Sequence, residues 1–134
     1  MGLKTGIDAT FAPRRSSSAG EGARWLAGPT GVTVWQGASG RQIAHTVYTL
    51  IGCPGLVDAV YLLVHRTPEQ RKLLAVAQTE TPVASLNLAR VREMGARLGA
   101  NEVHVHACAS AKSRARVERD LSLVLAGGEY PAAH

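Results

Sequence analysis

Residues 59–79 read AVYLLVHRTPEQRKLLAVAQT, two apolar runs joined by a short polar segment. The first run, residues 59–64, is continuously apolar, which is typical of a strand covered on both faces. The polar segment at residues 67–71 contains a proline and is too short for the crossover that parallel strands need. We therefore predict that the second run, residues 73–77, pairs antiparallel with the first and that both are central strands of a sheet.

The segment before this pair predicts a hairpin. Residues 32–36 alternate with the two-residue period of a strand. Residues 37–40, which contain two glycines and a serine, are a turn signal, and residues 43–50 follow as a second strand. The hairpin is expected to belong to the same sheet.

The segment after the pair predicts two helices separated by a strand. The first helix is expected from Ser85, which can cap it, to Leu98, with Gly99 ending it. Residues 103–107 alternate as a third central strand, and Ser110 is placed to cap a last helix with one apolar face. The predicted fold class is α+β: a small, mostly antiparallel sheet, made of an N-terminal hairpin plus three central strands, with two packed helices.

Length and composition fit one small domain. The chain has 134 residues, 46% of them hydrophobic, so residues 30–134 can bury a core. Residues 1–29 are rich in Gly, Ser and Pro and lack periodicity, so we expect a flexible N-terminal tail. Two cysteines, Cys53 and Cys108, are too few for a disulfide framework and favour a cytoplasmic location. No apolar stretch approaches the roughly 18 residues of a membrane helix, so no membrane partner is expected.

The charge balance indicates an anionic partner. The 15 Lys and Arg residues exceed the 10 Asp and Glu residues, and the net charge is +5. Most of the cations are arginines, whose planar guanidinium suits phosphate. Such a positive field attracts DNA, RNA or another anionic surface. The alternative is a soluble basic protein without such a ligand, because the arginines are spread along the chain.

Four segments follow the order of motifs in a known nuclease superfamily. Residues 59–61, Ala-Val-Tyr, stand where that superfamily has Gly-Ile-Tyr, and residues 75–79, Ala-Val-Ala-Gln-Thr, stand where it has Tyr-Ile-Gly and often Gln-Thr. A helix with Arg90 or Arg92 follows, and a later helix carries Glu118. The chain thus resembles a divergent member of the GIY-YIG nuclease superfamily.

The resemblance implies a phosphodiesterase site, and the departure from the motif at Ala75 implies that its activity is lost. Through it, Tyr61 acts as or assists the base, Arg90 neutralises a phosphate, and Glu118 holds a divalent ion, Mg²⁺ or Mn²⁺. Ala75 stands at the second motif tyrosine, and losing such a group costs about 10²–10⁴ in rate. We therefore expect a catalytically degenerate GIY-YIG-like domain, over about residues 32–131, that binds nucleic acid or a protein partner through a basic groove. The alternatives are an active divalent-metal-dependent endonuclease and a protein-interaction module without a phosphate ligand.

Arginines of the first helix are the candidate nucleic-acid contacts. Arg90 and Arg97 are seven residues apart and share a helix face, while Arg92 lies elsewhere on the helix. A basic face of this kind contacts phosphates or is simply solvated.

Two of the site candidates also have plain structural interpretations. Tyr61, in an apolar strand, fits a core-edge tyrosine with its hydroxyl at the surface. Glu118 follows Arg114 by four residues, so the two can form a helical ion pair worth about 0.3–0.5 kcal/mol if exposed.

A pair of histidines lies two positions apart in the last predicted strand. His104 and His106 point to one side of that strand, and such a pair can bind a transition metal if His45 or Glu118 supplies a third ligand. The alternative is two solvent-facing histidines without a ligand.

Overall fold

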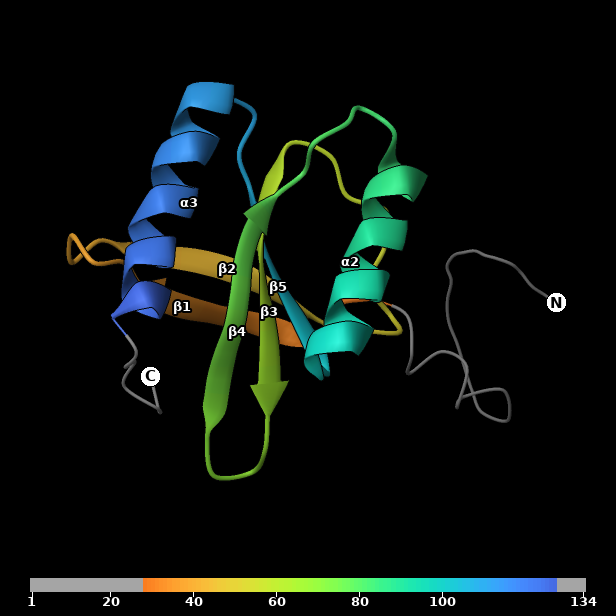
Figure 1. Ribbon diagram of the computed structural model, residues 1–134, viewed down its shortest axis with the longest axis horizontal. Coiled ribbons are helices and arrows are strands. Elements are labelled where there is room, and N and C mark those ends of the chain that lie inside the picture. Colours follow the sequence, from red (N-terminus) through yellow and green to blue (C-terminus); the bar gives the residue numbers. More distant parts are fainter. Residues whose placement is uncertain (1–27, 128–134) are drawn as a thin grey trace, which may run out of the picture.

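The computed structural model describes residues 28–127 (Figure 1). The flexible tail expected at residues 1–29 lies almost wholly outside this range, as does the end of the predicted domain beyond residue 127. Neither described helix is long and apolar enough to cross a membrane. The described elements are, in chain order, β1 Gly31–Gln36, β2 Gln42–Thr49, β3 Ala59–Arg66, β4 Arg71–Gln78, α2 Ala84–Leu98, β5 Glu102–Ala107 and α3 Ala111–Ala126.

One five-stranded sheet with the strand order β1-β2-β5-β3-β4 forms the centre of the fold, and all its pairs are antiparallel. The expected small antiparallel sheet with two helices is confirmed. The expectation that residues 73–77 form a central strand is wrong, because β4 lies at one edge of the sheet and pairs with β3 alone among the described strands. The prediction that residues 103–107 form a central strand is confirmed, because β5 lies between β2 and β3. Which strands flank it depends on pairing of distant segments, which local patterns do not indicate.

The two helices cover opposite faces of the sheet (Figure 1). Side chains of β3 alternate between these faces: Tyr61 and Leu63 pack with α2, whereas Val60 and Leu62 pack with α3. Because both sides of β3 are covered, its apolar run is continuous. Full burial of one leucine such as Leu62 stabilises the fold by about 1.5–3 kcal/mol.

Helix α2 begins without the predicted cap. Its N-cap is Val83, which makes no side-chain cap, and Ser85 lies inside the first turn. Asn87 holds the preceding turn instead: its side-chain oxygen accepts a hydrogen bond from the Thr81 N–H at 3.3 Å, and its amide nitrogen donates to the Leu56 carbonyl at 2.6 Å. These two bonds, worth about 1 kcal/mol each, tie the start of α2 to the turn before it and to the loop before β3, although they leave the first N–H groups of the helix uncapped.

Two other predicted helix ends are confirmed. The Ser110 hydroxyl caps α3 by accepting a hydrogen bond from the Ser113 N–H at 3.2 Å. Gly99 ends α2 with a φ of 85°, in the left-handed region where a residue with a Cβ is strained.

The β1–β2 hairpin is clamped onto α3. The two carboxylate oxygens of Asp120 accept hydrogen bonds from Ser39, one from its backbone N–H at 2.8 Å and one from its hydroxyl at 2.7 Å. The Asp120 carbonyl accepts another from the Ala38 N–H at 3.2 Å. A Cβ on Gly37 would overlap this carboxylate, so the close contact between hairpin and helix requires glycine there.

Candidate functional site

Tyr61 lies on β3, packed on the α2 side of the sheet, and is 2% exposed. Its hydroxyl donates a hydrogen bond to Sδ of Met94 at 3.9 Å. Burial raises the pKa of Tyr61; Arg90 opposes this through its charge and a hydrogen bond, while the charges of Glu80 and Glu118 add to it. A phenol kept protonated in this way does not act as a base near neutral pH.

Of the three arginines expected to contact nucleic acid, Arg90 is the one that lies beside Tyr61. Arg92 donates to the Ile51 carbonyl at 2.9 Å and so ties α2 to the loop after β2. Arg97 forms an exposed ion pair with Glu93 at 3.1 Å. Arg92 and Arg97 are thus engaged within the protein.

Glu118 lies on the other side of the sheet. Its carboxylate accepts a hydrogen bond from Nε2 of Gln78 at 2.7 Å, and Gln78 lies opposite Val60 in the pairing of β4 with β3. Because Val60 packs with α3 and Tyr61 with α2, the structure brings Tyr61 and Arg90 together but keeps Glu118 on the opposite face. The charge of Glu118 still acts on Tyr61, as the smallest of the contributions to its pKa.

Arg114 is engaged by other groups than Glu118. It donates to Asp58 at 3.3 Å and to the Cys108 carbonyl at 2.8 Å, which braces the start of α3 against the loop before β3. The ion pair between Arg114 and Glu118 that their four-residue spacing suggested does not form, and Arg114 instead contacts residues outside α3.

The described residues do not fit a preformed site for Mg²⁺ or Mn²⁺. Across residues 28–127, no group of three or more His, Cys, Asp or Glu side chains is arranged to hold a metal ion. Glu118 would be a single carboxylate ligand, and one of its oxygens already accepts from Gln78. A lone carboxylate is a weak site for a hard divalent cation.

His104 is fully buried, so the interpretation of this residue as solvent-facing is wrong. Its Nδ1 accepts a hydrogen bond from Nε1 of Trp35 at 2.8 Å, and its Nε2 lies 2.8 Å from Oε1 of Glu102. Burial lowers the pKa of His104, although the hydrogen bond and charge of Glu102 act in the opposite direction. Both ring nitrogens are used, which leaves neither free for a metal ion.

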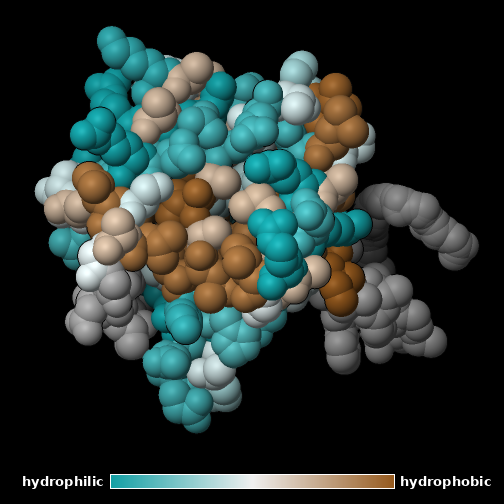
Figure 2. Space-filling model, in the orientation of Figure 1, coloured by the Kyte–Doolittle hydropathy of each residue, from teal (hydrophilic) through white to brown (hydrophobic). Residues whose placement is uncertain are grey.

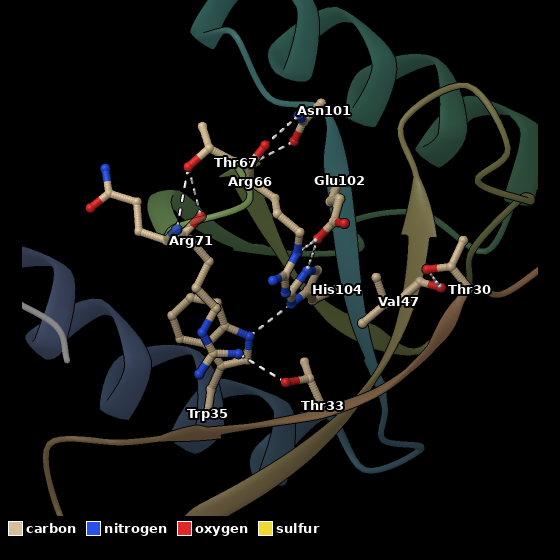
Figure 3. A network of polar contacts seen from close by, with 11 residues as sticks. Thr30, Thr33, Trp35, Val47, Arg66, Thr67, Arg71, Asn101, Glu102 and His104 are labelled. Atoms are coloured by element: carbon tan, nitrogen blue, oxygen red, sulfur yellow. Dashed lines mark hydrogen bonds and ion pairs between the residues drawn. The ribbon is translucent and has the colours of Figure 1, made fainter. Parts of the chain in front are cut away.

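The contacts of His104 extend into a polar network that joins the two edges of the sheet (Figure 3). Glu102 accepts a second bond from Nε of Arg66 at 2.9 Å. Arg71 of β4 stacks on the Trp35 ring at 3.7 Å and donates to the Thr33 hydroxyl at 2.9 Å. The two edge strands, β1 and β4, are thus connected across the α3 face, which gives the network a structural role.

His45 and His106 lie side by side on neighbouring strands, with their ring centroids 5.6 Å apart. Each Nδ1 is hydrogen-bonded to a backbone carbonyl, at 2.9 Å to Ile43 and 3.0 Å to Ala44 respectively. Because carbonyls only accept, both Nδ1 atoms carry the proton. Burial lowers the pKa of His45 to about 3, and its Nε2 is buried without a hydrogen-bond partner.

A basic stripe on the outer face of α3 was not among the residues expected from the sequence to contact nucleic acid. Lys112, Arg116 and Arg119 are all exposed, and their spacing of four and three residues places them on one face. The two carboxylates of the helix form no ion pair with these three side chains in the described part of the chain: Glu118 accepts a hydrogen bond from Gln78, and Asp120 accepts hydrogen bonds from the β1–β2 hairpin. The spacing of the three residues could have indicated the stripe from the sequence. It could not have shown that Glu118 and Asp120 are hydrogen-bonded to other residues.

No protein-family model, curated protein or solved structure matches the chain. The geometry of the described residues therefore carries the functional argument.

Proposed function

We propose that this chain is a nucleic-acid-binding domain of GIY-YIG-like type that lacks metal-dependent cleavage activity. The stripe on α3 carries the proposal, because Lys112, Arg116 and Arg119 present three exposed positive charges. The two carboxylates of the same helix are hydrogen-bonded to other residues and, within residues 28–127, form no ion pair with them. From the first to the last of them the helix rises about 10.5 Å, a length that spans several phosphates of a strand. Arginine and lysine contacts to phosphates bind without selecting sequence.

Arg90 supplies a second contact, on α2. It lies next to the buried Tyr61 hydroxyl and forms no ion pair within residues 28–127. Since α2 and α3 cover opposite faces of the sheet, the two contacts belong to separate surfaces. The proposal therefore replaces the single basic groove expected from the sequence with binding through helix surfaces.

Three observations support the absence of cleavage. The pKa of the Tyr61 hydroxyl is raised, so it is a poor base. Glu118 lies on the opposite face from Tyr61 and Arg90. Ala75, at the position of the second motif tyrosine, offers no hydroxyl.

The test is the salt dependence of binding to a short DNA duplex and a single strand of the same sequence. Arg116→Gln/Arg119→Gln is compared with Arg92→Gln/Arg97→Gln, which removes the same charge from arginines that already have protein partners. Each lost phosphate contact flattens the slope of log K against log salt by about 0.9 on a duplex. We expect a change of nearly two for the α3 pair and less than half of that for the α2 pair.

Equal slopes for the two variants would contradict the role of α3. Binding that is absent at low salt in the unmodified chain would contradict nucleic-acid binding itself and favour the protein-interaction module.

A further inference from the structure

The two edges of the sheet differ in how far they are covered. At the β1 edge, the guanidinium of Arg71 reaches across from β4 and donates to the Val34 carbonyl at 2.9 Å. At the β4 edge, the described strands supply one neighbour, β3, so the outer side of β4 has no strand partner. An edge strand exposes backbone N–H and C=O groups that can pair with another strand.

Apolar side chains gather over β4 in the space between α3 and α2 (Figure 2). Leu74, Ala75, Val76 and Ala77 are consecutive, uncharged and only partly buried, and Leu125 of α3 is 37% exposed. Polar surface borders this patch above and below in the same view. A contiguous apolar patch with a polar rim is typical of a protein–protein interface.

The charges at the two ends of β4 are self-complementary. Lys72 is exposed near the beginning of the strand, Glu80 is exposed just after its end, and residues 73–79 between them carry no charge. Neither Lys72 nor Glu80 forms an ion pair within the described part of the chain. An antiparallel pairing of two identical strands brings the beginning of each to the end of the other, so each lysine meets a glutamate.

We propose that β4 is the interface of a two-fold homodimer in which two copies pair their β4 strands antiparallel. The interface is centred near Val76, which lies midway between the two charged ends. The bulge at Leu74, the extra residue between Ala75 opposite Leu63 and Leu73 opposite Val64, confines regular pairing to the part of β4 that follows it. Lys72, before the bulge, and Glu80, after the end of β4, therefore meet through their long side chains on either side of the paired segment. Ala75 and Ala77 keep this part of the edge accessible to a second backbone because their side chains are small.

The test is sedimentation equilibrium of the full chain and of charge-reversal variants. The unmodified chain should sediment with twice its mass of 14.1 kDa. Lys72→Glu and Glu80→Lys each place like charges together twice in a two-fold dimer, so each should raise the dissociation constant about tenfold. The double variant Lys72→Glu/Glu80→Lys restores both pairs and should recover the affinity of the unmodified chain.

A second pair of variants tests the centre of the strand against the opposite edge. Val76→Lys should yield a monomer, whereas Val32→Lys, on the β1 edge where Val32 is 73% exposed, should leave the dimer intact. Because Val76 also packs partly against the α3 core, circular dichroism confirms that the variant is folded; the charge reversals leave the core untouched.

Two outcomes would overturn the proposal. One is an unmodified chain that remains monomeric at about 100 μM, far above a micromolar dissociation constant, which would assign this edge to another protein or another segment of the chain. The other is a dimer that the double charge reversal fails to restore, or that Val32→Lys disrupts as much as Val76→Lys.

Discussion

Trp35 donates its indole N–H to Nδ1 of His104 at 2.8 Å, in a fully buried contact that links β1 to β5 past the intervening strand β2. An indole nitrogen only donates, so Nδ1 of His104 is unprotonated and its Nε2–H donates to Glu102. One aromatic residue at the sheet edge thereby selects the tautomer of a histidine at the sheet centre. Arg71 stacked on the Trp35 ring completes the connection to β4.

Trp35→Phe is expected to lower the free energy of unfolding by about 1–3 kcal/mol. The substitution keeps an aromatic ring under Arg71 but leaves the buried Nδ1 of His104 without a donor. Urea unfolding gives the stability. NMR titration of His104 should show a pKa higher than in the unmodified chain, because Nδ1 becomes free to accept a proton. A variant as stable as the unmodified chain would show that the hydrogen bond contributes nothing.

Acid is expected to destabilise the domain through its buried histidines. Burial lowers the pKa of His45 from 6.5 to about 3, and burial also lowers that of His104. Below pH 6.5 the unfolded chain binds protons that the folded chain excludes, so the free energy of unfolding decreases as the pH falls. The loss is about 1.4 kcal/mol per pH unit for His45 alone, until the pH reaches about 3.

Urea unfolding at pH 7 and pH 4.5 measures this loss. His45 alone is expected to lower the free energy of unfolding by about 2.7 kcal/mol over this interval. His45→Phe should flatten the pH dependence, whereas His65→Phe, at an exposed position on β3, should retain it. A free energy of unfolding that is constant over this interval would refute the burial of an uncharged His45.

Gly37→Ala is expected to destabilise the domain by about 1–3 kcal/mol, since its Cβ would overlap the Asp120 carboxylate and push the hairpin away from α3. Gly31→Ala is the matched control, because nothing lies within 4 Å of a Cβ there. Thermal unfolding should show a clear decrease in Tm for the first variant and little change for the second, at about 4–8 °C per kcal/mol. Similar Tm values for both variants would mean that the contact between Gly37 and the Asp120 carboxylate can accommodate a methyl group without loss of stability.

The chain is expected to leave plasmid and branched DNA uncut in Mg²⁺ or Mn²⁺. The reasons are the raised pKa of Tyr61, the placement of Glu118 on the other face, and Ala75 in place of a tyrosine. A gel assay with both metal ions measures cleavage, and Glu118→Ala is the control for a contaminating nuclease. Cleavage that disappears in Glu118→Ala would instead establish an active metal-dependent endonuclease.

Local features of the fold were predictable where the signal was itself local. The short turn after β3 correctly indicated its antiparallel pairing with β4, and Ser110 and Gly99 correctly marked helix ends. Ser85 was the wrong cap, because Asn87 holds the α2 start through a bond to Leu56, a contact distant in sequence.

The candidate site was predictable only in part. Tyr61 and Arg90 lie close together, as the motif order implied, but Glu118 projects from a helix on the other face. Motif order specifies which residues occur, whereas the side of the sheet depends on where each helix docks.

The amino-acid sequence by itself determined the strand and helix periods, the α+β class, the positive charge and the alternation of β3 side chains, because these depend on neighbouring residues. The tertiary structure decided which strands flank β5, the exposed edge at β4 and the different environments of His104 and His106. These two histidines point to the same side of one strand, yet only the first is covered by Trp35 and fully desolvated. Burial and pKa depend on which distant segments cover a residue, and that is settled by long-range pairing and packing, which short patterns do not encode.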